Sequence, residues 1–103
     1  MTGQLPPEAC ETMAALRVQI DRIDAALLDL LAQRAGYIDR AIVLKQIEGL
    51  PARTTGRVAE VIAKVRAGAG QRGLDPELAE RLWTELIEWA IAHEARVLDA
   101  DQA

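Results

Sequence analysis

The stretch Leu30–Lys45, LLAQRAGYIDRAIVLK, reads as the middle of a long helix whose apolar face is interrupted by an arginine. An apolar seam leads up to this arginine, with its members three or four positions apart: Leu16, Ile20, Ile23, Leu27 and Leu30. The next position in this series is Arg34, and apolar residues return at Ala41 and Leu44. A guanidinium on a face that a helix normally buries requires an explanation, because an unpaired buried charge is costly.

The pattern on both sides of this stretch predicts a first helix of about 35 residues. Thr12 is a candidate N-cap for a helix that begins near Met13, and Gly49 followed by Pro51 ends the pattern. Such a helix is about 50 Å long, whereas a compact domain of this size is only about 33 Å across. We therefore expect the helix to bury its seam against another chain, in a homodimer with interleaved helices.

Two shorter helices are predicted after the loop GLPARTTG. Thr54 or Thr55 can cap the second, which ends in GAGQRG, and Asp75 caps the third with Pro76 at its first position. The predicted fold is all-α, with three helices, the first very long, in a single domain over residues 1–103. We expect residues 1–11 to form a flexible lead-in.

Composition excludes several classes of function. A formal net charge of −4 argues against nucleic acid, which is bound by clustered Lys and Arg, but positive charge focused in one pocket can still hold a small anion. Cys10 is the single cysteine, so no intramolecular disulfide forms and a reducing compartment is expected. No signal-peptide pattern and no apolar run of about 20 residues is present, so we expect a cytoplasmic protein without a membrane span.

Two cations lie on one face of the first helix. Arg34 and Lys45 are eleven residues apart, close to three turns, so their side chains leave the same face about 16 Å apart and can close on one small molecule. Arg17 lies about 25 Å from Arg34 along the axis, too far to share that ligand within one chain. In an antiparallel dimer, the partner's Arg17 would reach the same pocket.

The third helix carries an anomaly of opposite sign. Glu94 stands between Ala90 and Val97 in an apolar series that begins at Trp83. Burial favours the protonated form of such a carboxylate, whereas neighbouring cations favour its ionised form.

Each of these residues also has an ordinary structural explanation. Arg34 can pack its stem and extend its head to water, Glu94 can mark a solvent-facing helix end, His93 can be a packing residue, and the tryptophans can be core. Four cations that face one cavity would repel one another without an anion between them. The coincidence of Arg17, Arg34, Lys45 and Arg57 with Glu94 therefore points to a small dianionic ligand.

The segments LRVQIDRIDAALLDLLAQR, PAR, GLDP and LWTELIEWAIAHE, with a lysine eleven residues after Arg34 and an arginine opening the second helix, resemble the all-helical chorismate mutases over residues 13–98. The resemblance implies an intertwined homodimer that converts chorismate to prephenate, in aromatic amino acid biosynthesis on the shikimate pathway. It also implies that neither a metal nor a cofactor takes part.

The same resemblance implies a role for each matching residue. Arg34 and the partner's Arg17 would bind the two carboxylates, and Arg57 would support the carboxylate end. Lys45 would donate to the ether oxygen, and Glu94 would face that oxygen where family members carry Gln or Glu.

Three substrate-binding positions depart from the family pattern. Thr54, Val58 and Ala90 stand where mutases carry Asp, Glu and Ser, so recognition of the ring hydroxyl is open. At these positions the sequence is more similar to isochorismate-pyruvate lyase, which serves salicylate and siderophore biosynthesis. That enzyme, however, has Gln at the position of Glu94. A third alternative is a mutase of 4-amino-4-deoxychorismate, and outside enzymes a helical dimerisation module needs only the apolar seams.

Overall fold

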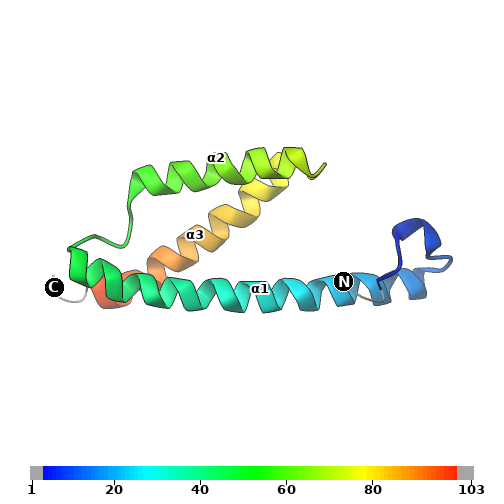
Figure 1. The fold of residues 1–103 in the computed structure, drawn as a ribbon, viewed down its shortest axis with the longest axis horizontal. Coiled ribbons are helices and arrows are strands. Elements are labelled where there is room, and N and C mark those ends of the chain that lie inside the picture. The colour runs from blue at the N-terminus through cyan, green and yellow to red at the C-terminus, as the bar shows by residue number, and fades with distance from the viewer. Residues whose placement is uncertain (1–3, 100–103) are drawn as a thin grey trace. The chain divides into compact units, whose positions relative to one another are not determined.

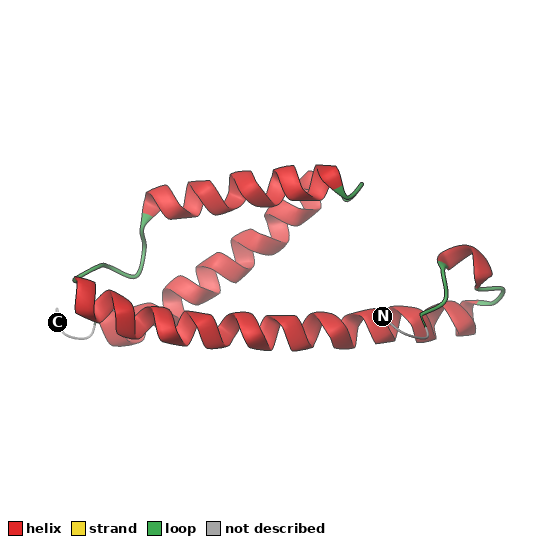
Figure 2. Ribbon diagram, in the orientation of Figure 1, coloured by secondary structure: helices red, strands yellow, loops and turns green. Residues whose placement is uncertain are grey.

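The computed structural model describes residues 4–99, and this part of the chain contains helices and no strands (Figures 1 and 2). Its elements in order are η1 (Pro7–Ala9), α1 (Met13–Glu48), α2 (Thr55–Gln71) and α3 (Pro76–Leu98). The predicted all-α class and the three predicted helices are confirmed, and α1 is 36 residues long. The chain divides into two units, one ending at residue 36 and the other beginning at residue 37, and each is described by itself.

The first unit is the N-terminal part of α1 with the segment that precedes it. The Thr12 hydroxyl accepts the backbone N–H of Ala15 at 3.1 Å, so Thr12 caps α1 as expected. The segment expected to be a flexible lead-in has structure in its described part. Gln19, which is 8% exposed, accepts the Leu5 N–H on its side-chain oxygen at 2.9 Å and the Gln4 amide on its backbone carbonyl at 3.2 Å. These bonds hold residues 4–10 against α1, while residues 1–3 lie outside the described part.

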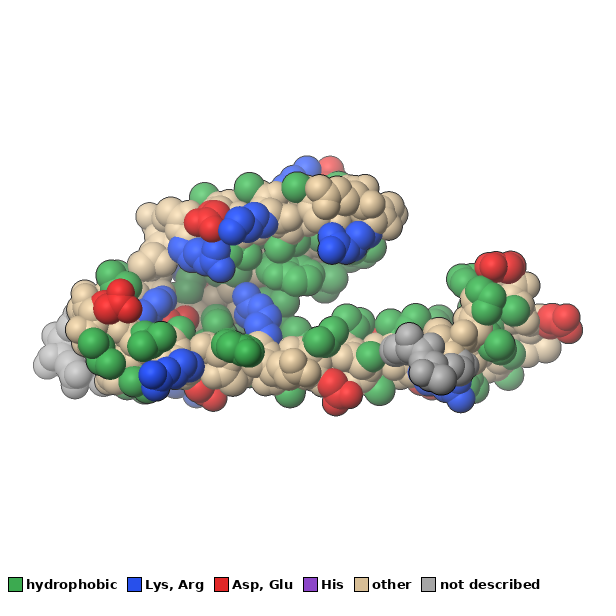
Figure 3. All heavy atoms as spheres, viewed as in Figure 1, with side chains coloured by type: hydrophobic (Ala, Val, Ile, Leu, Met, Phe, Trp, Pro, Cys, Tyr) green, Lys and Arg blue, Asp and Glu red, His purple; other side chains and the backbone are tan. Residues whose placement is uncertain are grey.

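The apolar seam of the first unit is exposed within one chain. Hydrophobic side chains follow this part of α1 on the surface (Figure 3), and those that are large and exposed are Met13, Val18, Ile20, Ile23, Leu27, Leu28, Leu30 and Leu31. Burial of apolar surface contributes about 25 cal/mol per Å², so this face would gain stability from a partner. The interleaved homodimer stays a prediction.

The second unit begins with the C-terminal part of α1, which a glycine ends. Gly49 has a φ of 71°, and the N–H of Leu50 turns back to donate to the carbonyl of Lys45 at 2.9 Å. This arrangement is a Schellman cap, in which a left-handed residue satisfies the free carbonyls of a helix end. Pro51 follows and cannot continue the helix.

The same device ends α2, and α3 begins with a side-chain cap. Gly73 has a φ of 71°, and Leu74 N–H donates to the Ala69 carbonyl at 2.9 Å. Asp75 then accepts the Glu77 N–H at 2.9 Å, with Pro76 at the first position of α3, as predicted. Two caps placed back to back turn the chain sharply, and α3 runs back toward the end of α1 (Figure 1).

Small side chains form the core of the second unit, because α2 and α3 pack closely through alanines. Ala69 of α2 is 5% exposed and Ala79 of α3 is 1% exposed. Ile42, Ala52, Ile87 and Ala90 complete the buried apolar set of the described residues. Across the same pair of helices, Arg66 and Glu80 form an ion pair of 3.0 Å. No helix in residues 4–99 is long and apolar enough to cross a membrane.

We predict opposite effects of alanine at two glycines. Gly49→Ala should destabilise the protein by about 1 kcal/mol, because alanine must adopt the positive φ. Gly36→Ala, in the interior of α1 where an added Cβ meets no atom within 4 Å, should stabilise by up to about 1 kcal/mol. Thermal unfolding measures both. A Gly49→Ala variant as stable as the wild type would show that the turn after α1 does not need a left-handed residue.

Candidate functional site

A buried carboxylate and a lysine meet where α3 returns to the end of α1. Glu94 of α3 is 4% exposed, and its Oε1 lies 2.8 Å from Nζ of Lys45, in the last turn of α1. Nζ also donates to the backbone carbonyl of Ala52 at 2.7 Å. The structure thus brings together the two residues that the sequence predicts to be catalytic.

Lys45 Nζ and Glu94 Oε1 are close, but their relative orientation does not meet the angles of a hydrogen bond. Although the two charges are 2.8 Å apart, Glu94 Oε1 receives no hydrogen bond from the described residues. We take the contact as electrostatic, since a hydrogen bond requires alignment as well as proximity. An ammonium has three N–H donors and Ala52 takes one, so Lys45 retains donors for a ligand.

The loop between α1 and α2 carries the carbonyl that holds Lys45. Arg53, the next residue after Ala52, reaches Glu88 of α3 with two parallel hydrogen bonds of 3.0 and 2.7 Å. The hydrogen bond from Arg53 holds the pKa of the Glu88 carboxyl below its usual value, and the same bond raises the pKa of Arg53. Both groups are therefore charged at neutral pH, and the loop is attached to α3.

A second polar contact joins α1 to α3 beside the first. Nε2 of His93 lies 2.7 Å from Oδ1 of Asp39, and the imidazole stacks on Trp89 with ring centroids 4.9 Å apart. His93 precedes Glu94 in the chain, so the two contacts leave α3 on adjacent positions. His93 has packing contacts here.

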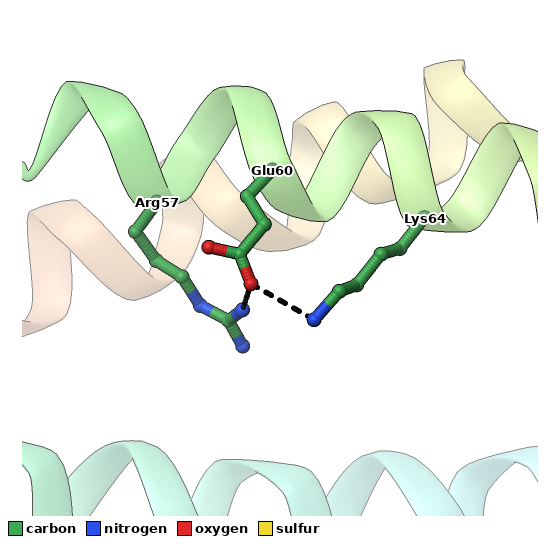
Figure 4. A network of polar contacts seen from close by, with 3 residues as sticks. All are labelled: Arg57, Glu60 and Lys64. Carbon is green, nitrogen blue, oxygen red and sulfur yellow. Dashed lines mark hydrogen bonds and ion pairs between the residues drawn. The ribbon is translucent and has the colours of Figure 1, made fainter.

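Arg57 has a different environment from Lys45. In the first turn of α2, its side chain is 61% exposed and donates to Glu60 Oε1 at 2.9 Å, and Lys64 reaches the same oxygen at 2.8 Å (Figure 4). The hydrogen bond from Lys64 and the charge of Arg57 lower the pKa of the Glu60 carboxyl. Arg57 also borders a hollow of about 360 Å³ between α2 and α3, with Val61, Val65 and Trp83 among its apolar walls. Within the second unit, Arg57 and Lys45 therefore contact different partners.

Two of the predicted cations belong to the first unit. Arg17 is exposed and Arg34 is half-buried on α1. The pocket that four cations would share stays a prediction.

The three positions that depart from the family pattern are on α2 and α3. Thr54 is the N-cap of α2, although its side chain makes no capping bond, and Val58 is half-buried one turn later. Ala90 is buried one turn before Glu94 on the same face of α3. Ala90 therefore lies with Glu94 on the same buried face of α3, whereas Thr54 and Val58 lie at the start of α2.

Sequence reasoning missed the contacts that orient Lys45. The acceptor at Ala52 is a backbone carbonyl, which no side-chain pattern reveals. Arg53 stands in the PAR motif, but its partner Glu88 is 35 residues away. The contact between Asp39 and His93 spans 54 residues, and only the spacing of Trp89 and His93 by one turn was a local signal.

Within residues 4–99, no group of three or more His, Cys, Asp or Glu side chains could hold a metal ion. The polar groups that meet here are the Lys45 ammonium, the Glu94 carboxylate and the Ala52 carbonyl.

Comparison with known proteins gives consistent matches along the chain. Isochorismate pyruvate lyase of Pseudomonas aeruginosa is 34% identical over 91 residues, which is 87% of this chain and 88% of the relative. 4-Amino-4-deoxychorismate mutase of Streptomyces pristinaespiralis is 32% identical over 82 residues, 80% of this chain and 64% of the relative. The T-protein of Enterobacter agglomerans is 41% identical over 68 residues, 66% of this chain but 18% of the relative.

The sequence profile of the type II chorismate mutases matches residues 16–95. That range contains Arg17, Arg34, Lys45, Arg57 and Glu94, together with all of α2 and most of α1 and α3. The chain belongs to the type II chorismate mutase family.

Proposed function

We propose that this protein is a chorismate mutase, which converts chorismate to prephenate. The observation that carries the proposal is the buried contact of Lys45 and Glu94, in which the ammonium donates one N–H to the Ala52 carbonyl and keeps others for a ligand. Membership of the family supplies the class of substrate.

The reaction suits a site without a nucleophile. In this Claisen rearrangement one carbon–oxygen bond breaks and one carbon–carbon bond forms within a single molecule, and no atom is gained or lost. The enzyme must hold a compact conformer and stabilise the negative charge that grows on the ether oxygen. Lys45 supplies a cation with N–H donors for that charge.

Glu94 requires a proton for the same task. An ionised carboxylate is only an acceptor, whereas a protonated one has an O–H to donate. In the contact with Lys45 the Glu94 carboxylate is an acceptor. The proposed mechanism therefore requires Glu94 to be protonated when substrate is bound, so that it donates to the ether oxygen beside Lys45.

The carboxylates of the substrate require further cations. Arg34, Arg57 and the partner's Arg17 are proposed to bind them, in a homodimer whose helices interleave. The exposed apolar seam on the first unit of α1 supports the dimer, because a second copy would cover it. We also propose a cytoplasmic enzyme of the shikimate pathway, which requires no cofactor.

Two sister activities remain alternatives for specific reasons. The lyase on isochorismate is favoured by the relative that matches 87% of this chain, and by Val58, Thr54 and Ala90. Glu94 favours a mutase, and a carboxylate there also suits an amino substituent, as in 4-amino-4-deoxychorismate. A purely structural dimerisation module would not need Arg34 on the seam.

The substrate is decided by offering chorismate, isochorismate and 4-amino-4-deoxychorismate separately to the purified protein. We expect prephenate from chorismate, identified by chromatography and mass spectrometry. Salicylate with pyruvate from isochorismate would replace the proposal by the lyase. No turnover of any of the three, together with a gain of stability in Arg34→Leu, would identify a dimerisation module.

Lys45→Ala and Glu94→Gln test the chemical step. Lys45→Ala should lower kcat much more than it changes KM, because the contact strengthens in the transition state. Glu94→Gln should keep most of the activity, because an amide N–H can donate to the ether oxygen as a protonated carboxyl does. Steady-state kinetics measures both variants. A loss confined to KM in Lys45→Ala, or a large loss of kcat in Glu94→Gln, would contradict the assigned roles.

Mixing two inactive variants tests the shared pocket. If each site combines Arg34 of one chain with the partner's Arg17, refolding Arg17→Ala with Arg34→Ala gives mixed dimers with one intact site. Half of the dimers are mixed, so about a quarter of the wild-type activity should return. Arg34→Ala mixed with Lys45→Ala is the control and should stay inactive, because both residues would serve the same site from one chain. No recovery in the first mixture would contradict the shared site.

A further inference from the structure

We infer that Arg53 and Glu88 are positioning residues, whose ion pair latches the loop after α1 onto α3 and thereby holds the Ala52 carbonyl against the Lys45 ammonium. The inference rests on the proposed function for the catalytic importance of Lys45. The geometry of the latch itself does not depend on that function.

The latch has the geometry that makes an exposed ion pair effective. The two terminal guanidinium nitrogens of Arg53, Nη1 and Nη2, donate to Glu88 at 3.0 and 2.7 Å, one to each carboxylate oxygen. Exposed pairs usually contribute little to global stability, but two parallel bonds fix direction as well as distance. The pair therefore acts on the loop that carries Arg53 rather than on the whole fold.

The covalent chain transmits this constraint to Lys45. The Ala52 carbonyl and the Arg53 nitrogen belong to the same peptide group, which is planar and rigid. Fixing Arg53 on α3 therefore restricts the direction of the carbonyl that accepts Nζ at 2.7 Å. Ala52 is 5% exposed, so this peptide lies in the packed part of the loop.

The other end of the loop is already attached to the same lysine. The backbone carbonyl of Lys45 accepts the N–H of Leu50 at 2.9 Å, beside the left-handed Gly49. The segment 49–53 is thus held at the helix end by the backbone of Lys45 and at α3 by Arg53. One constraint thus acts on the backbone of Lys45, and the other acts on the carbonyl that accepts from its side chain.

Lys45 needs such a constraint because its side chain has four rotatable bonds and ends in a compact charge. One N–H of Lys45 donates to the Ala52 carbonyl, while Nζ lies 2.8 Å from Glu94 Oε1. The other two N–H groups therefore point away from Ala52. Without the carbonyl, the ammonium would be free to turn fully to the carboxylate, and its remaining N–H groups would point in other directions. The latch thus fixes the direction in which Lys45 offers its free N–H groups to a substrate.

The chain offers a matched control pair. Arg66 and Glu80 form an ion pair of 3.0 Å whose side chains are 45% and 44% exposed, against 47% and 50% for Arg53 and Glu88. The control pair also ends on α3, but it connects α2 and touches no loop at Lys45. Any effect of losing one exposed ion pair on α3 should therefore appear in both pairs.

The first experiment measures the reactivity of Lys45 without substrate. Lys45 and Lys64 are the two lysines of the sequence, so acylation with a small amine-reactive ester, followed by mass spectrometry, gives Lys45 with the 69%-exposed Lys64 as internal reference. We expect Arg53→Ala and the milder Glu88→Gln to raise the relative labelling of Lys45 severalfold, and Arg66→Ala to leave it unchanged. Unchanged labelling in both latch variants would overturn the latch, whatever the enzyme does.

The second experiment measures turnover in the same folded variants, with whichever substrate the wild type converts. We expect Arg53→Ala and Glu88→Gln to lower kcat by roughly tenfold with little change in KM, since small misplacements of a catalytic group have large effects on rate. The charge-swapped double variant Arg53→Glu with Glu88→Arg should recover part of both losses, and Arg66→Ala should keep the wild-type kcat. Faster labelling with an unchanged kcat would overturn the positioning role. Faster labelling in a protein that converts no substrate would support the latch and reject the proposed function.

Discussion

The second unit depends on one electrostatic constraint, which is a lysine ammonium placed between a backbone carbonyl and a buried carboxylate. Lys45 comes from the last turn of α1, the Ala52 carbonyl from the following loop, and Glu94 from the far end of α3. Three segments therefore meet at one nitrogen. A carboxylate that is 4% exposed requires a nearby cation, and the cation here is flexible enough to serve a ligand as well.

Local backbone chemistry makes this meeting possible. Gly49 and Gly73, both with a φ of 71°, end α1 and α2 sharply, and Asp75 with Pro76 starts α3 at once. The result is that α3 returns to α1 and places Glu94 near Lys45. Alanines at the contact between α2 and α3 permit the close approach of these helices, with little bulk in the core.

Three polar contacts leave the C-terminal half of α3 and differ in burial. Glu88 holds the loop through Arg53, His93 contacts Asp39, and Glu94 contacts Lys45. The exposed contacts contribute mainly direction, because water screens their charges. The buried contact carries the chemistry that the proposed function requires, and the pair of Arg53 and Glu88 is the exposed contact that we infer to orient it.

The sequence by itself determined the class of fold and the approximate bounds of the helices, because capping residues, glycines and the spacing of apolar side chains act within a few residues. Through the resemblance to the family it also singled out Lys45 and Glu94, although not the contact between them. It also singled out Arg57, but could not show that Arg57 shares Glu60 with Lys64 on its own helix, separately from Lys45. Only the tertiary structure decided that the Ala52 carbonyl accepts from Lys45, that Arg53 pairs with Glu88 and that Trp89 stacks on His93. Contacts across 35 or 54 residues depend on where α3 returns, which is set by packing and by turns acting together rather than by any local pattern.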